Sequence, residues 1–141
     1  MFINISNKLS NEFKKYSIET IERGASKKNF YRLRHSNKKF ILTDFSPNKE
    51  EYINHLKIYN LLKNINISVP KIIEKYDNNL MIISEDFGDL RFDKILQQYP
   101  LNELLHYAVD TLVILNNSIQ YDPKLSLPQY NFDIFKDEIL E

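Results

Sequence analysis

The sequence contains no cysteine, which excludes disulfide bonds, thiolate metal sites and cysteine nucleophiles. Histidine is scarce: His35, His55 and His106 are scattered, and none of them begins the H-E-x-x-H spacing of a helical zinc site. No apolar run approaches the roughly 18 residues that a membrane-spanning helix needs. Residues 1–15 also lack the apolar core of a signal peptide. These absences favour a cytoplasmic protein without a membrane partner.

Neither sign of charge is in excess, because 19 Lys and Arg residues balance 19 Asp and Glu residues. The chain therefore has no overall positive field to attract nucleic acid, and we expect no nucleic-acid partner. Hydrophobic residues make up 43% of the 141 residues, which is enough apolar surface for a packed core. The length fits one domain of ordinary size.

The residue pattern predicts strands first and helices later. Residues 6–15 are expected to form a short helix, because Leu9 and Phe13 share one face at i, i+4. The predicted strands are 17–22, 29–34, 39–44, 71–76 and 80–84. The predicted helices are 46–64, 90–98 and 101–119, and a last helix is expected from Asn131 to Glu141 after a loop at 120–130.

This order predicts the α+β class. Three strands, one helix and two further strands would form a single five-stranded antiparallel sheet with one helix lying across it, followed only by helices. Residues 46–48 and the acidic pair Glu50 and Glu51 indicate where the crossing helix begins, because negative charge is favourable at a helix N-terminus. The apolar face expected for residues 131–141 has little left in the sequence to pack on, which favours a truncated chain.

The sequence has only two glycines, and both lie in predicted turns. The first is in the turn Gly24-Ala25-Ser26 between the first two strands. Small residues there can fold over phosphate groups, offering backbone N–H groups and a hydroxyl. A plain β-turn is the alternative interpretation of this stretch.

The second glycine, Gly88, follows the last predicted strand in the run S-E-D-F-G-D at residues 84–89. A buried strand that ends in an acidic, glycine-containing bend before a helix is typical of the hinge between the two lobes of a kinase. A strand end followed by a helix cap explains the same residues equally well.

Taken in order, these features resemble a known family. The run G-A-S-x-x-x-F-Y-R-L from Gly24, the strand F-I-L-T-D from Phe40, Val69-Pro70 before a strand, and S-E-D-F-G-D occur in the same order as in the N-terminal lobe of the aminoglycoside phosphotransferase and choline kinase-like small-molecule kinases. Within this family the chain is most similar to bacterial kinases that phosphorylate the anomeric hydroxyl of N-acetylmuramate or N-acetylglucosamine. The resemblance covers roughly residues 17–141.

The resemblance implies a protein-kinase-like N-lobe at residues 1–86 and the first helices of a C-lobe at residues 87–141, with an ATP site between them. Residues of the glycine turn would cover the phosphates. The other implied contacts lie on the third strand and at the hinge, where backbone groups would meet adenine. The implied nucleotide-binding residues are Gly24, Ala25, Ser26, Ile41, Leu42, Ile83, Ser84, Glu85 and Asp86.

The resemblance also implies what this sequence does not contain. In the family, an H-x-D-x-x-x-x-N loop orients the attacking hydroxyl and a further aspartate binds Mg²⁺, and the sequence has neither. Asp86-Phe87-Gly88 spells the magnesium-binding tripeptide of protein kinases, but it follows a strand and no catalytic loop precedes it. Thr43 stands where many kinases of this fold carry a lysine. The chain is therefore expected to be an N-terminal fragment that is inactive by itself.

Two other interpretations remain open. The chain could be a natural lone lobe, without catalysis, that binds a nucleotide or another protein. It could also be an unrelated α+β binding domain whose motifs occur in this order by coincidence. The substrate of a complete enzyme, expected to be a small molecule such as a sugar, is not determined by these residues.

Overall fold

The chain folds as an α+β structure, as the order of its elements predicts. The computed structural model describes residues 5–21, 28–46, 48–89, 92–95 and 98–118. The elements in chain order are β1 (Ser17–Ile21), β2 (Asn29–His35), β3 (Lys38–Asp44), α2 (Lys49–Asn64), β4 (Ile72–Tyr76), the 3₁₀ turn η1 (Asp77–Asn79), β5 (Met81–Glu85), α3 (Phe92–Ile95) and α4 (Leu101–Ser118). Every strand that the alternation predicts is present, and no strand end is shifted by more than one residue.

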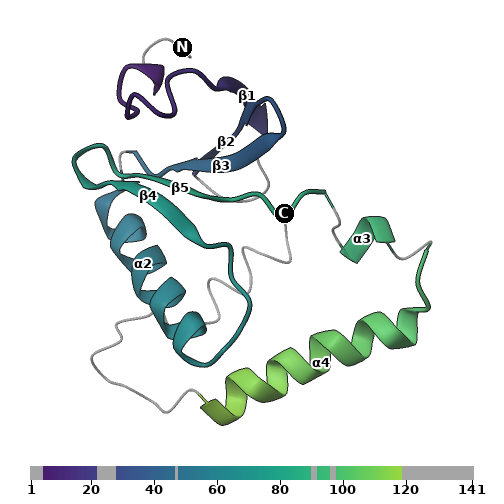
Figure 1. Cartoon of the computed structure of the whole chain (residues 1–141). Coiled ribbons are helices and arrows are strands. Elements are labelled where there is room, and N and C mark those ends of the chain that lie inside the picture. The colour runs from purple at the N-terminus through teal and green to yellow at the C-terminus, as the bar shows by residue number, and fades with distance from the viewer. Residues whose placement is uncertain (1–4, 22–27, 47, 90–91, 96–97, 119–141) are drawn as a thin grey trace, which may run out of the picture.

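The five strands form one antiparallel sheet in the order β1-β2-β3-β5-β4. The N-terminal turns lie over one face of this sheet and α2 crosses the other (Figure 1). The prediction of a five-stranded antiparallel sheet with one crossing helix is therefore confirmed. The strand order adds that β5 lies between β3 and β4, so the last strand is central and both of its edges are paired.

The larger core cluster lies on the face that the N-terminal turns cover. Because side chains alternate along a strand, every second residue of β2, β3 and β5 points to this face. Leu33, Leu42 and Ile83 are all 0% exposed there. The complete cluster consists of Ile5, Leu9, Phe13, Tyr16, Tyr31, Leu33, Leu42, Met81 and Ile83.

The helix α2 packs on the other face through a smaller cluster. Phe45, Tyr52 and Ile82 are buried together, and the rings of Phe45 and Tyr52 meet edge to face with centroids 5.5 Å apart. The helix begins as predicted: the Asn48 side chain accepts a hydrogen bond from the Glu51 N–H at 3.0 Å, which satisfies one of the free donors of the first turn.

The prediction of a helix over residues 6–15 is wrong, because this segment forms a series of turns with helical residues only at 5 and 6. A continuous helix would need the Ser10 N–H to bond the carbonyl of Ser6. The Ser10 N–H instead donates to the Tyr76 hydroxyl at 3.1 Å, and the Ser10 hydroxyl donates to Glu74 at 3.0 Å. Contacts with β4 therefore replace the helical ladder, while the apolar spacing still buries Leu9 and Phe13 in the core.

Among the residues that the structure describes, three other than glycine adopt left-handed backbone angles: Ser36 with φ 52°, Asn66 with φ 60° and Leu80 with φ 54°. Ser36 belongs to the tight turn between β2 and β3. Between β4 and β5 the left-handed angle falls on Leu80 and not on the Asp and Asn residues before it, which form η1. Leu80 packs against the α2 cluster, so tertiary packing decides which residue takes this conformation.

The helix α4 (Leu101–Ser118) confirms the helix predicted at 101–119 over its described residues. Of the helix predicted at 90–98, residues 92–95 form α3, whereas Gln98 lies in a turn. The apolar side chains of α4 are largely exposed: Leu104 is buried, whereas Leu101, Leu105 and Leu112 are at least half exposed. Within the described ranges, no helix combines the length and the apolar character required to cross a membrane. The loop predicted at 120–130 and the helix from Asn131 lie outside the described residues.

Replacing Phe13 should show that the N-terminal turns belong to the core. The ring is 1% exposed and meets Phe40 edge to face with centroids 5.4 Å apart. We expect Phe13→Ala to lower the free energy of unfolding by about 3–5 kcal/mol in urea titrations. The control Ile53→Ala removes a side chain that is 40% exposed on α2 and should change stability by less than about 0.5 kcal/mol. Equal stability of the two variants would contradict the assignment of these turns to the core.

Candidate functional site

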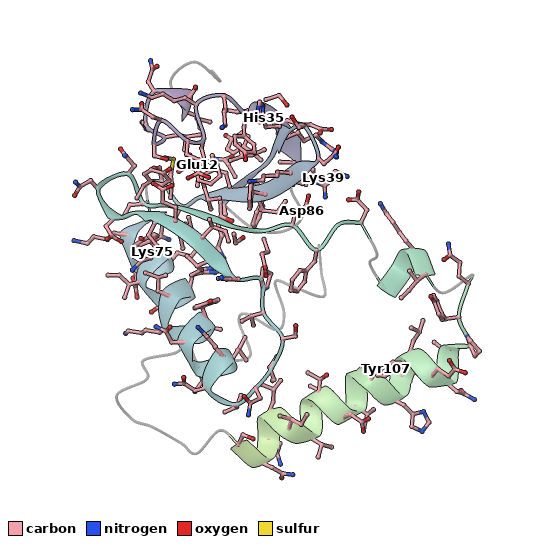
Figure 2. The ribbon with its side chains drawn as sticks, in the orientation of Figure 1. Glu12, His35, Lys39, Lys75, Asp86 and Tyr107 are labelled. Atoms are coloured by element: carbon pink, nitrogen blue, oxygen red, sulfur yellow. The ribbon has the colours of Figure 1, made fainter. Side chains whose placement is uncertain are left out.

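A pocket of about 710 Å³ lies between the sheet, α2 and the turn that follows β5. Small-molecule sites in proteins have volumes of about 300–1,000 Å³, and this pocket falls within that range. Asp86, one of the residues that line this pocket, lies at the point where the chain leaves β5 (Figure 2). The lining residues are Ile21, Phe30, Arg32, Ile41, Thr43, His55, Ile58, Tyr59, Leu62, Val69, Pro70, Ile72, Ser84, Glu85, Asp86, Phe87, Gly88, Asp89 and Lys94.

The pocket has two apolar walls. Ile21, Phe30 and Ile41 come from three neighbouring strands and form the wall on the sheet. Ile58 and Leu62 are four residues apart on α2, so they share one helix face and supply apolar lining from the helix. Apolar lining from both the sheet and the helix suits an aromatic or heteroaromatic ring, which buries its faces against apolar side chains when it binds.

Charged side chains gather at the end of the pocket near β5. Arg32, in the middle of β2, reaches the two aspartates of the following turn. Its Nε lies 2.7 Å from Asp86 Oδ2, and its Nη2 donates to Asp86 Oδ1 at 3.2 Å. The other edge of the guanidinium donates to Asp89, with Nη2 to Oδ1 at 2.9 Å and Nη1 to Oδ2 at 3.1 Å. One guanidinium thus engages a carboxylate on each of two edges.

The two ion pairs differ in their access to water. The side chains of Arg32 and Asp86 are 12% and 3% exposed, whereas that of Asp89 is 69% exposed. Water therefore screens the Asp89 contact far more strongly than the Asp86 contact. The hydrogen bond from Arg32 still holds the pKa of Asp89 below its usual value. With two carboxylates and one guanidinium, this cluster carries one net negative charge.

His55 lines the pocket from the middle of α2, and its ring lies 5.1 Å from that of Phe45. Burial lowers the pKa of His55, and the nearby positive charge of Lys28 lowers it further, while Glu51 opposes the shift. Lys28 itself is bound to Glu51 of α2 at 3.1 Å. This ion pair joins the segment before β2 to the first turn of the helix.

Four of the residues predicted for nucleotide binding line this pocket together: Ile41, Ser84, Glu85 and Asp86. In the sheet register Ile41 stands between Arg32 and Ser84, so these three residues form one row across the pocket face.

Leu42 and Ile83 are not brought to this pocket. Each is the neighbour of a pocket residue along its strand, and the alternation of side chains turns both into the core on the opposite face. Gly24, Ala25 and Ser26, expected to cover the phosphates, lie outside the described residues.

Sequence motifs did not identify Arg32 as a site residue. A signal was present, because Arg32 stands between the buried residues Tyr31 and Leu33 in an alternating strand and must point to the face opposite theirs. An arginine in the middle of a central strand needs a partner there. The sequence does not show that two aspartates more than 50 positions away supply it.

No group of three or more His, Asp or Glu side chains that could bind a metal ion occurs among the described residues. The two aspartates beside the pocket face a guanidinium, which already neutralises part of their charge. The Mg²⁺ that is expected to accompany ATP is predicted to take its ligands from a part of the C-lobe that this sequence does not contain, so the described residues do not test this prediction.

Stability should depend on pH through His55. The pKa of His55 in the folded state is below the ordinary value of 6.5. At pH values above 6.5 the ring is therefore neutral in both states, and its contribution to stability is fully present. As the pH falls below 6.5, the unfolded chain binds a proton first and the folded state loses stability. We expect the urea midpoint of the wild type to fall more steeply than that of His55→Gln between about pH 7 and pH 5.

A matched variant separates this effect from the titration of other groups. His106→Gln replaces an exposed histidine on α4 and is the matched control for the substitution itself. Parallel curves for the wild type and His55→Gln would show that burial does not shift the titration of this ring.

Comparison with known proteins identifies no relative of this chain. No family model, no curated protein and no solved structure matches it. The function of the pocket must therefore be inferred from its geometry and from the sequence motifs around it.

Proposed function

We propose that this chain binds ATP in the pocket beside β5 and is the nucleotide-binding part of a phosphotransferase. The acceptor would be a hydroxyl group of a small molecule, a sugar or an amino sugar. The observation that carries this proposal is the position of the pocket: it lies where the S-E-D-F-G-D run leaves the sheet, and this run is the one whose resemblance implies the adenine site.

The shape and chemistry of the pocket support a nucleotide. A purine ring between Ile41 on the sheet and Leu62 on α2 would bury both of its faces. Its polar edge would meet the backbone after β5, since the ladder between β3 and β5 ends at Glu85 and Asp86 is the first residue beyond it. The net negative charge of the aspartate cluster disfavours phosphate groups at that end and directs them away from it.

Binding without turnover is the activity that this chain is proposed to have. Phosphoryl transfer requires a carboxylate that positions the attacking hydroxyl and ligands that hold Mg²⁺. None of the three histidines begins an H-x-D sequence, and the described residues hold no metal-binding group. The groups that this chain does supply are those that bind and orient a nucleotide.

Isothermal titration with ATP tests the proposal. We expect saturable binding of one ATP per chain. Ile41→Trp places a bulky side chain in the pocket and should weaken binding at least about tenfold, since a filled pocket no longer buries the base. The control Ile53→Trp adds the same ring on an exposed part of α2 and should bind ATP like the wild type.

The same samples measure turnover. Phosphate release from ATP by the wild type should not exceed that of a blank. Absence of ATP binding by the folded wild type, or equal binding by Ile41→Trp, would refute nucleotide binding in this pocket.

A further inference from the structure

The turn at residues 86–89 is held to β2 at both of its ends. Asp86 opens the turn directly after β5, and Asp89 closes it. Both carboxylates bind the same guanidinium, that of Arg32, which lies two strands away from β5 in the sheet. A contact between residues 54 to 57 positions apart therefore fixes the path of the chain as it leaves the sheet.

Asp86 also shapes the turn from inside. Its Oδ1 accepts a hydrogen bond from the Gly88 N–H at 2.8 Å, and Gly88 has φ +79°, an angle that side-chain-bearing residues rarely adopt. The Asp86 carboxylate thus accepts hydrogen bonds both from the backbone of the turn and from Arg32 on β2. Because its side chain is 3% exposed, water cannot replace the guanidinium at low cost if the pair is broken.

We propose that Arg32 is a positioning residue of the pocket: by holding Asp86 and Asp89 it sets the turn at residues 86–89 before a ligand binds. The proposal deepens the proposed function and rests on it for its ligand measurement. Arg32 need not touch the nucleotide in order to act. When the turn is already ordered, ligand binding loses less conformational entropy. Affinity should therefore depend on the contacts of Arg32 with Asp86 and Asp89 that order the turn.

The shape of the guanidinium, and not only its charge, is required for this role. A lysine in place of Arg32 keeps the positive charge, but its single ammonium cannot present two edges to two carboxylates. Loss of the two Arg32–carboxylate contacts and loss of the positive charge therefore have different effects on the affinities for ATP and adenosine. A pure charge effect acts on ATP, which is strongly anionic, and spares adenosine, which is neutral. A loosened turn weakens both ligands.

Four proteins test the proposal: the wild type, Arg32→Lys, Arg32→Met and the control Arg34→Met. Arg34 lies on the same strand and pairs with Glu19 at 3.0 Å, but it does not line the pocket. The affinities for ATP and for adenosine are measured by isothermal titration. We expect both Arg32 variants to bind both ligands about tenfold more weakly than the wild type, and Arg34→Met to match it.

Hydrogen exchange without ligand gives a readout that does not depend on nucleotide binding. In Arg32→Met the amides of residues 86–89 should exchange at least about tenfold faster than in the wild type, while those in the middle of α2 keep their protection. If the wild type binds neither ATP nor adenosine, the proposed function fails, and the exchange data still decide whether Arg32 orders the turn.

Three results would overturn the proposal. They are unchanged exchange at residues 86–89 in Arg32→Met, wild-type affinity of Arg32→Lys for both ligands, or a loss that affects ATP alone. If Arg32→Met does not fold because Asp86 is left as an unpaired buried charge, Arg32→Met/Asp86→Asn removes both charges and undergoes the same measurements.

Discussion

The arrangement of this protein depends on the alternation of side chains along its central strands, β3 and β5. Both strands have partners on each side, so neither can change register without breaking two ladders. Leu42 and Ile83 point into one core, and Ile41 and Ser84, their neighbours, point to the pocket. A shift of one residue would exchange the two sets, placing polar Ser84 in the core and turning Leu42 and Ile83 toward the pocket.

Burying the Arg32 guanidinium beside Asp86 carries a desolvation cost that the attraction between the charges only partly offsets. Apolar residues at these positions would fill the same space without that cost. The charged pair nevertheless gives the chain a directional contact between β2 and the turn after β5, which apolar packing does not provide. Arg32 and Asp86 both line the pocket, and the proposed role of this pair in ligand binding rests on that position.

Sequence patterns were sufficient for the elements whose stability is local or follows a clear period. The five strands follow from alternation, and the start of α2 follows from Asn48 and the acidic first turn. The same reasoning failed for residues 6–15, where the spacing of Leu9 and Phe13 correctly identified core residues but not their backbone conformation. A hydrogen bond from Ser10 to Tyr76, 66 positions away, competes with the helix there, and local propensity contains no information about it.

By itself the sequence determined the α+β class and the polar turn after β5, because alternation and turn composition act over a few neighbouring positions. Four of the residues that line the pocket were expected only from the resemblance of the motifs to a known family. Only the tertiary structure decided the strand order, the exclusion of Leu42 and Ile83 from the pocket, and the meeting of Arg32 with Asp86 and Asp89. Each of these depends on which distant segments become neighbours. That choice is made by burial of apolar surface and pairing of charge across the whole fold, and not by the residues adjacent in the chain.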